Sequence, residues 1–340
     1  MKMNMGRAGN ILLIMVIVFM TSASWASAAL PDLEEQIRNK AFTNPAERLS
    51  MPPEWIERPI QYSDEAKGAD LTIVLDQDIH HTFVPIIHRF ATANKLKVFV
   101  KESTCGIAAA MLAKKNTDMG GFCCPPGKED RLPGIQVHTI GIVAKAILVH
   151  PENPVEDITT EQARKIFQGK ISRWSELETP QGQKGPALTI QPMGRFHCKT
   201  RPGHWYQLLP DEKMFSPLLH EVGAIPDMIS LVSSTKNAIG WEVLSMADHY
   251  KNLGSVKPLK INGHPPTDKE AIANREYPFY RTYNVTTWAG DKVKNDNAKK
   301  LVDYLIKESA GIDSRFGFVP SNKLRKAGWR FLGDELIGEP

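Results

Sequence analysis

Apolar residues recur along the first half of the chain in two alternating patterns. Short continuous apolar runs have the length of buried strands, and between them apolar residues recur every three or four positions, as on one face of a helix. The pattern predicts strands over Leu71–Leu75, Leu96–Val100 and Met119–Phe122, and helices over 83–91, with Pro85 in the first turn, and over Ile107–Ala113. Strands that alternate with helices are typical of βαβ units, so the sequence predicts a parallel sheet.

A second series of elements begins with a long apolar stretch, Val137–Val149, which we expect to form a strand that crosses between two halves of the molecule. A capping box follows, because Thr159 can accept the backbone amide of Gln162 while the Gln162 side chain reaches back to Thr159. The remaining pattern predicts strands over 188–192, 238–243 and 277–287, and a helix over 298–306 with a clean apolar stripe. The chain is therefore expected to visit one lobe, pass to a second and return, which leaves a cleft at a hinge.

We therefore predict an α/β chain with two lobes, each a mostly parallel sheet flanked by helices and joined to the other by hinge strands. Residues 29–68 are polar and interrupted by prolines, and they are expected to form a leader segment with one helix near Leu33–Lys40. The first lobe is predicted to comprise residues 69–138 and 280–340, and the second lobe residues 139–279.

The first 28 residues have the composition of a secretory signal peptide. Lys2 and Arg7 precede the apolar run Ile11–Met20, and small residues end in an Ala-Ser-Ala site at residue 28. The run is shorter than the roughly 20 residues that a membrane span needs, so we expect cleavage to release a soluble protein outside the cytoplasm. A membrane anchor is the alternative. No cysteine precedes Cys105, which argues against a lipid-anchored N-terminus.

Size and charge limit the class of partner. Cleavage would leave about 312 residues (340 minus 28), more than one hydrophobic core usually serves, which favours two lobes. Removal of Lys2 and Arg7 takes the formal charge from +4 to +2. That charge is too close to neutral for a polybasic surface, so the composition argues against nucleic-acid or membrane binding.

Four segments resemble one protein family. Residues 157–177 contain Ile-Phe-Gln-Gly-Lys-Ile-Ser-Arg-Trp and are similar to the Ile-Phe-x-Gly-Lys-Ile-x-x-Trp segment of the phosphate-binding subunits of ABC importers. Three further segments agree in order: Asn116-Thr-Asp-Met-Gly120, Asn237-Ala-Ile-Gly-Trp241 and Gly317-Phe-Val-Pro320. The resemblance covers about residues 70–320. It implies a type II periplasmic-binding fold whose lobes close on a small ligand.

The resemblance also implies where a ligand would bind. In this family backbone amides at helix N-termini and Ser/Thr hydroxyls, with one arginine and one carboxylate, hold a tetrahedral oxyanion between the lobes. Carried onto this chain, the expected ligand contacts are His81, Ser103, Thr104, Cys105, Gly106, Cys123, Arg195, Lys199, Thr200 and Arg201.

The binding loops depart from the family in their side chains. His81 falls on or beside a family threonine, Cys105 takes the place of the serine that precedes a glycine, and Cys123 lies near the acidic position. After Arg195, which is kept, the Ser-Gly-Thr of the family is replaced by a segment that includes Cys198. All four cysteines of the chain, Cys124 included, therefore fall on loops that the family directs at its ligand.

Three interpretations of these cysteines are open. Two disulfides would suit an exported protein. A site for a soft ligand would use Cys105, Cys123, Cys124 and Cys198, with His81 and His197, to bind Cu(I), Zn(II) or a thiophilic metalloid. A copper or zinc ion is then the candidate cofactor. In the third interpretation an oxyanion is held by Arg195, Lys199, Arg201 and backbone amides.

A catalytic role is not expected. Cys198 adjoins His197, and a neighbouring imidazolium can activate a thiol, but no orienting acid accompanies the pair. We predict a monomeric periplasmic solute-binding protein that is no enzyme, with a small molecule or ion as its ligand and an ABC importer permease as its partner. The alternative is a metal-handling or redox-active protein on the same fold that is not coupled to an importer.

Overall fold

Helices and strands alternate along the described part of the chain, residues 32–177 and 184–340 of a computed structural model. The helices are α1 (Leu33–Lys40), α2 (Pro53–Glu57), α3 (Gln77–Asn94), α4 (Cys105–Ala113), α5 (Thr160–Phe167), α6 (Ile225–Ser234), α7 (Leu244–His249), α8 (Lys269–Ala273), α9 (Asp296–Glu308) and α10 (Ser321–Lys326). The strands are β1 (Leu71–Asp76), β2 (Val98–Ser103), β3 (Met119–Phe122), β4 (Ile135–Val149), β5 (Asp157–Ile158), β6 (Gln191–Gly194), β7 (His220–Glu221), β8 (Ala238–Val243), β9 (Lys257–Pro258), β10 (Lys260–Ile261), β11 (Tyr280–Trp288), β12 (Phe318–Pro320), β13 (Arg330–Leu332) and β14 (Glu335–Gly338). Two short helical turns, η2 (Lys128–Asp130) and η4 (His204–Gln207), flank the loops discussed below.

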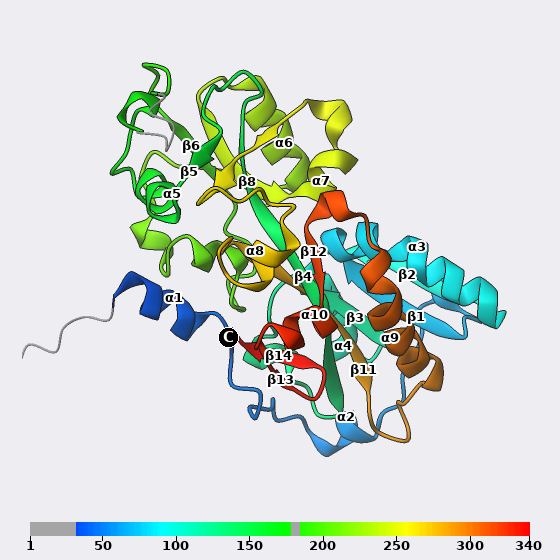
Figure 1. Cartoon of the computed structure of the whole chain (residues 1–340). Coiled ribbons are helices and arrows are strands. Elements are labelled where there is room, and N and C mark those ends of the chain that lie inside the picture. The colour runs from blue at the N-terminus through cyan, green and yellow to red at the C-terminus, as the bar shows by residue number, and fades with distance from the viewer. Residues whose placement is uncertain (1–31, 178–183) are drawn as a thin grey trace, which may run out of the picture. The chain divides into compact units, whose positions relative to one another are not determined.

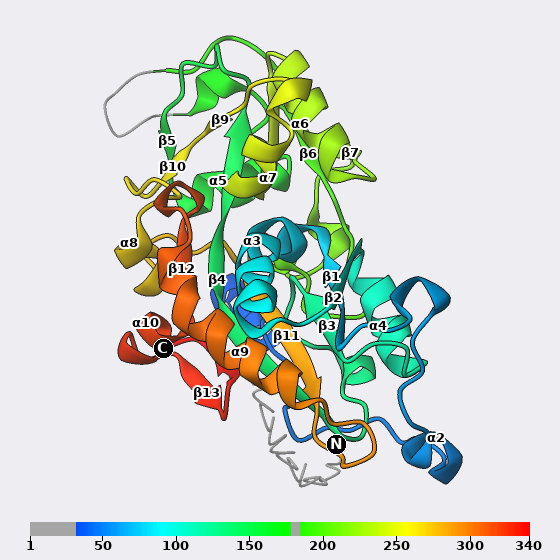
Figure 2. The same ribbon diagram turned by 90° about the vertical axis from the view of Figure 1, so that its right-hand side faces the viewer.

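Ten strands form one sheet in which β4 is the longest member. The strand order is β2-β1-β3-β11-β4-β8-β6-β7, and β9 and β12 pair with β4 outside that path. The first part of β4 pairs with β11 and β12, and its last part pairs with β8 and β9. Every residue of β4 except Gln136 is buried. Figure 2 shows β4 passing through the middle of the molecule between these two groups of strands.

The predicted parallel pairing is found at both ends of the sheet. Strand β1 runs parallel to β2 and to β3, and β6 runs parallel to β7 and to β8. The middle of the sheet is antiparallel. Strand β11 runs antiparallel to β3 and to β4, and β4 runs antiparallel to β8. Since β1, β2 and β3 point the same way, the loops that follow them emerge at one edge of the sheet.

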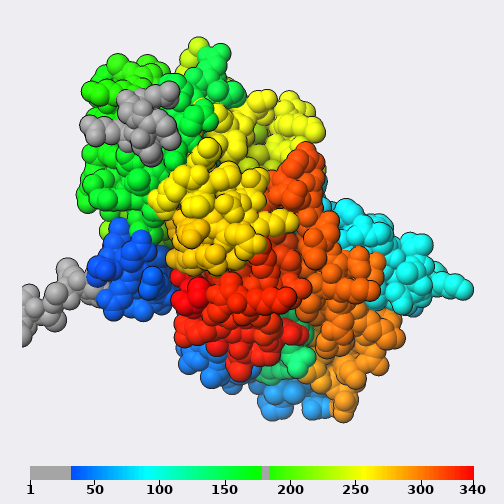
Figure 3. All heavy atoms as spheres, in the orientation of Figure 1, coloured from blue at the N-terminus to red at the C-terminus, as the bar shows by residue number. Residues whose placement is uncertain are grey.

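Two large apolar clusters lie on either side of the middle of β4. One is centred on α3, α9 and β1, with Phe83 and Tyr283 at 5.8 Å between ring centroids. The other surrounds Trp174, Trp241 and Phe167 and includes the face of α5. In Figures 1 and 3, α8 lies directly beside the C-terminal segment around β13. Trp329 Nε1 donates a hydrogen bond to Ala273 O (2.7 Å) across that contact.

Most predicted elements are present, and several differ in extent. The strand predicted at Leu96–Val100 is β2 (Val98–Ser103), and the strand predicted at 277–287 is β11 (Tyr280–Trp288). Helix α1, strand β3 and the capping box of Thr159 with Gln162 agree with the sequence pattern. Helix α3 begins at Gln77, because the Asp76 side chain accepts the amide of Asp78 and caps it, so Pro85 lies inside the helix instead of in its first turn. Strand β6 begins at Gln191 and not at Leu188, whose side chain is exposed.

The leader segment contacts the loop after η4 and helix α4. Lys40 Nζ in α1 donates to Pro210 O (2.7 Å), and Trp55 Nε1 in α2 donates to Ala113 O (2.6 Å). Residues 33–340 form one compact unit, and the proposed lobe boundaries at residues 69–138, 139–279 and 280–340 stay a prediction. The predicted signal peptide, residues 1–28, lies outside the described residues. Within the described ranges, no helix is both long and apolar enough to cross a membrane.

Candidate ligand site

Parallel strands place two of the cysteines at one edge of the sheet. Cys105 is the first residue of α4, which follows β2 directly and is capped by Thr104, whose hydroxyl accepts the amide of Ile107 (3.3 Å). Cys123 and Cys124 follow β3. Because β2 and β3 both lie beside β1 and run parallel to it, the Cys105 and Cys123 side chains emerge together, next to Asp76 at the end of β1.

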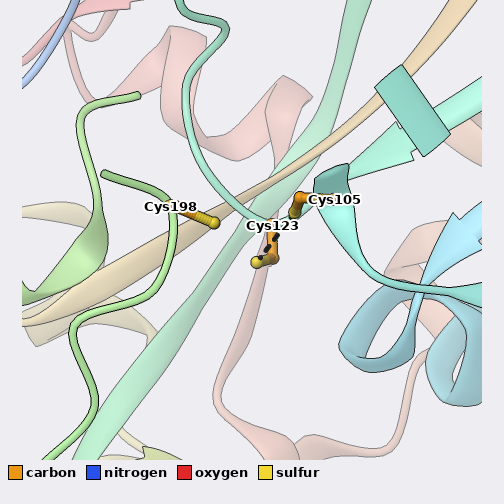
Figure 4. A group of neighbouring side chains, drawn as sticks. All are labelled: Cys105, Cys123 and Cys198. Carbon is orange, nitrogen blue, oxygen red and sulfur yellow. Dashed lines mark hydrogen bonds between the residues drawn. The ribbon is translucent and has the colours of Figure 1, made fainter. Parts of the chain in front are cut away.

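Three sulfur atoms converge in this place. Cys105 Sγ lies 3.4 Å from Cys123 Sγ, and the sulfurs of Cys105, Cys123 and Cys198 all lie within 4.8 Å of one another. Figure 4 shows Cys198 pointing toward the other two from a loop on the opposite side. Cys124 Sγ is 4.0 Å from Cys123 Sγ and does not belong to that three-sulfur group. All four thiols are free, so no disulfide joins them. We call Cys105, Cys123 and Cys198 the three-sulfur site.

The loop between β6 and η4 supplies Cys198. Its backbone has φ of 60°, in the left-handed region that non-glycine residues seldom occupy. Trp205 Nε1 donates to His197 O (3.1 Å), and the Arg201 amide donates to Cys198 O (3.1 Å). At Gly127 a Cβ atom would come within 2.4 Å of Thr200 O, so the loop packs tightly against the segment before η2.

The three-sulfur site is largely buried, and the pKa values of Cys123 and Cys105 shift in opposite directions. Cys105 and Cys123 are 3% and 1% exposed, and Cys198 is partly exposed. Hydrogen bonds from the Cys105 and Cys124 thiols lower the pKa of Cys123 well below its usual range. The hydrogen bond to Cys123 raises the pKa of Cys105, and burial adds to that effect. The arrangement therefore favours a thiolate at Cys123 with protonated thiols around it.

Arginines near the site are already paired with carboxylates. Arg195 Nη2 lies 3.1 Å from Glu242 Oε2, and Arg281 Nη2 lies 2.9 Å from Glu242 Oε1. Arg281 also forms an ion pair with Asp78. Although burial raises the pKa of Glu242, the two arginines outweigh it and lower that pKa. Sequence reasoning missed Asp78, Glu242 and Arg281, whose only sequence signal is a charged residue inside or beside an apolar strand.

Several buried polar atoms around this network have no hydrogen-bond partner. They include Arg195 Nε, Arg281 Nε, His197 Nδ1 and His204 Nδ1. Beside them lies a cavity of about 20 Å³, lined in part by Cys123, His204 and Arg281. A cavity of that size has room for about one water molecule. Buried donors and acceptors of this kind are expected to have a partner, so the region is suited to a small polar ligand or bridging water.

Other residues predicted for the site lie elsewhere or have structural partners. His81 stacks on His249, with ring centroids 4.3 Å apart, in a separate recess between α3 and α7. The structure does not bring His81 to the sulfurs, because α3 starts four residues before it and turns it toward α7.

The hydroxyl and amine groups proposed for an oxyanion are also engaged. Ser103 Oγ donates to Leu75 O (3.3 Å), Thr104 caps α4, and exposed Lys199 pairs with Glu212 (3.1 Å). Arg201 forms a buried pair with Asp130 at 2.5 Å, which raises the pKa of its guanidinium despite burial. Gly106 and Thr200 are exposed.

Comparison with known proteins assigns the fold. The family described as the PBP superfamily domain matches residues 67–309, more than half of the chain. The phosphate-binding protein PstS of Bacillus subtilis (strain 168) is 26% identical over 190 residues, which is 55% of this chain and 58% of that protein. PstS 2 of Streptococcus agalactiae serotype V is 27% identical over 90 residues, 26% of this chain and 30% of that protein. The chain thus spans less than two thirds of the curated relatives that it matches.

Solved structures agree on the architecture. An ABC-type phosphate transport receptor from Vibrio cholerae has a TM-score of 0.55 at 18% identity and covers 73% of this chain and 99% of its own. A putative phosphate ABC transporter substrate-binding protein with bound phosphate, from Clostridium perfringens, has the same score and identity over 79% of this chain and 100% of its own. At 18% identity these two structures show that the fold is shared. The chain belongs to the PBP superfamily as a divergent relative of the phosphate-binding proteins, and it has the two-lobed α/β fold predicted from its sequence.

Proposed function

We propose that this protein is an exported solute-binding receptor whose ligand is a thiophilic ion held by the three-sulfur site. The observation that carries the proposal is the convergence of Cys105, Cys123 and Cys198, from three separate loops, within 4.8 Å of one another. Soft thiolate ligands select soft ions such as Cu(I) and Zn(II), and thiophilic metalloids share that preference. The family membership supports capture between two lobes. Delivery to an ABC importer permease is the role that the names of its structural neighbours suggest, and we propose that the protein acts as a monomer.

Pairing of the cationic side chains argues against an oxyanion such as phosphate. Each arginine predicted for anion binding already has a carboxylate partner, Glu242 for Arg195 and Asp130 for Arg201. An anion would have to compete with these buried partners, and leaving a buried carboxylate unpaired costs roughly 3–5 kcal/mol. Release of Lys199 from Glu212 would cost little, but that exposed pair offers only a screened charge.

A second role rests on the same sulfurs. A metal-handling or redox-active protein would use the thiols without any permease, and the thiolate favoured at Cys123 suits redox chemistry. Stable ion binding that protects the thiols from alkylation supports a receptor or carrier. Rapid oxidation to a Cys105–Cys123 disulfide in place of ion binding supports the redox role.

Calorimetry on the reduced mature chain under argon tests the proposal. We expect tight binding of at least one soft ion among Cu(I), Zn(II) and arsenite, and weak binding of phosphate. The substitution Cys123→Ser should weaken soft-ion binding at least about 100-fold, because loss of an outer-shell partner alone can cost that much. Cys124→Ser, which keeps the three donors but removes a thiol that bonds Cys123, should weaken binding less than Cys123→Ser does. His220→Gln, at an exposed position in β7, is the unchanged control. Tight phosphate binding that survives Cys123→Ser, with no soft ion bound, would overturn the proposal.

A further inference from the structure

We propose that the ligand of the three-sulfur site is a trivalent metalloid, arsenic or antimony, which arrives as the neutral trihydroxide and is held by one bond to each of Cys105, Cys123 and Cys198. This inference rests on the proposed function and names the class of its ligand. It follows from the number of donors, the charge of the surroundings and the space available.

The number of donors matches a trivalent metalloid. Arsenic(III) and antimony(III) form three bonds in a pyramid, and a lone pair occupies the fourth direction. Among the described residues, the group of donors that contains these three sulfurs includes no histidine nitrogen and no carboxylate oxygen. Structural zinc sites almost always have four protein ligands. Three sulfurs from three loops therefore match the metalloid shell in number, whereas zinc would need a fourth ligand from outside this group.

The surroundings disfavour added negative charge. Cys105 Sγ donates to Asp76 Oδ2 (3.4 Å), and Asp76, Asp78 and Cys123 form a second buried group with donor atoms within 4.8 Å of one another. Three thiolates on Zn(II) or Cu(I) would give a net anion beside these carboxylates, at a large cost in a buried site. Three thiolates on a trivalent metalloid give a neutral product.

The reaction balances without an oxidant or a reductant. Each metalloid–sulfur bond replaces one metalloid–hydroxide bond, and the hydroxide leaves as water with the thiol proton. Where a sulfur has already lost its proton, the proton comes from solvent. No atom changes oxidation state.

The space at the site suits a ligand that loses its oxygens. The cavity next to the site is lined by Cys123 but not by Cys105 or Cys198, and it is about 20 Å³, room for about one water molecule. A bound phosphate would need space for five non-hydrogen atoms. After the three waters leave, the metalloid adds a single atom between sulfurs that are already neighbours.

Mass spectrometry of the reduced mature chain with arsenite tests the inference. We expect one arsenic per chain, with a mass gain equal to one arsenic atom less three hydrogens, and an ultraviolet band from sulfur-to-arsenic charge transfer. Cys198→Ser leaves two thiols, so its adduct should keep one hydroxide and bind at least about 100-fold more weakly. Cys124→Ser keeps all three donors and should keep the mass of three bonds, although it removes a thiol that bonds Cys123. The control His220→Gln, at an exposed position in β7, should bind as the wild type does. Circular dichroism of each ligand-free variant shows that it is folded, and Cys198→Ala provides a second variant at the partly exposed position.

The outcomes separate this inference from the proposed function. If Cu(I) or Zn(II) binds through the same cysteines and arsenite does not, the metalloid assignment is wrong and the receptor for a soft ion stands. If none of the three ions binds, both fail. Arsenite binding that is equal in wild type and Cys198→Ser, or that shows the mass of two bonds only, also overturns the assignment.

Discussion

Cys198 has a strained backbone, and its side chain belongs to the three-sulfur site. The residue has φ of 60°, a conformation that costs an L-residue roughly 1–2 kcal/mol relative to the right-handed region. The same conformation directs the thiol toward Cys105 and Cys123. Strained residues of this kind cluster at binding sites, where the surrounding structure holds them. Here the hydrogen bonds of Trp205 and Arg201 to the loop backbone fix the turn.

This strain makes glycine and alanine differ at position 198. Both Cys198→Gly and Cys198→Ala should lose soft-ion binding, because both remove the thiol. The ligand-free glycine variant should be as stable as the alanine variant or more stable, by up to about 1 kcal/mol, because glycine adopts this φ freely. Urea unfolding of the two variants measures the difference. A markedly less stable glycine variant would show that the turn is unstrained.

The cysteines were predictable from the sequence because each follows a strand or a family motif at a loop that faces the cleft. The ion pairs could not be predicted from the sequence. Arg281 pairs with Asp78 and Glu242 because β11, the start of α3 and β8 lie close together in the fold, and the spacing of these residues along the chain does not indicate that. His81 was assigned to the site by its position in a loop, and the earlier start of α3 places it in a helix instead.

At the scale of elements, two loops from different parts of the sheet determine the geometry of the site. The segment before η2 contacts the loop that carries Cys198, and Gly127 is the point of closest approach. Because glycine has no Cβ atom, Thr200 O can lie close to the Gly127 backbone. A Cβ atom at this position would be 2.4 Å from that oxygen. The buried pair of Arg201 with Asp130 joins the same two loops.

A methyl group at position 127 should therefore displace Cys198. We expect Gly127→Ala to reduce the free energy of unfolding by about 1–3 kcal/mol, the usual cost of overpacking, and to weaken soft-ion binding. Gly311→Ala is the control, since nothing lies within 4 Å of a Cβ atom there. Thermal unfolding and calorimetry check both effects. Unchanged ion affinity in Gly127→Ala would mean that the loop contact does not position the sulfur.

The elements themselves were largely predictable, since their apolar periodicity records which face is buried. Strand β3 and the capping box of α5 agree with the pattern, because both depend on neighbouring residues only. The start of α3 was not evident, because its first turn is polar and the cap is Asp76 at the end of a buried strand.

At the scale of the whole molecule, the C-terminal hairpin of β13 and β14 is attached to the central strand. The His138 ring of β4 bonds Asp334 through Nδ1 (2.9 Å) and Thr287 through Nε2 (2.8 Å). Burial lowers the pKa of His138, although Asp334 opposes that shift. The folded protein therefore holds this imidazole in its neutral form at a pH where the unfolded chain would protonate it.

This difference predicts a loss of stability in acid. The contribution of His138 is fully present above the unfolded pKa of about 6.5 and is lost as the pH falls below it, because the unfolded state then binds the extra proton. His138→Gln should flatten the fall in the free energy of unfolding between about pH 6.5 and pH 5. His220→Gln, at an exposed position in β7, is the control. Equal slopes for His138→Gln and wild type in urea titrations would contradict the assignment.

The pairing of β4 with different strands at its two ends affects how the protein unfolds. Its fifteen residues belong at one end to β11 and β12 and at the other end to β8 and β9. If either group of neighbouring strands unfolds, one end of β4 loses its hydrogen-bond partners. The other group then pairs with a strand that is only partly ordered. Denaturation is therefore expected to be a single all-or-none event, even though the chain has two separately packed cores.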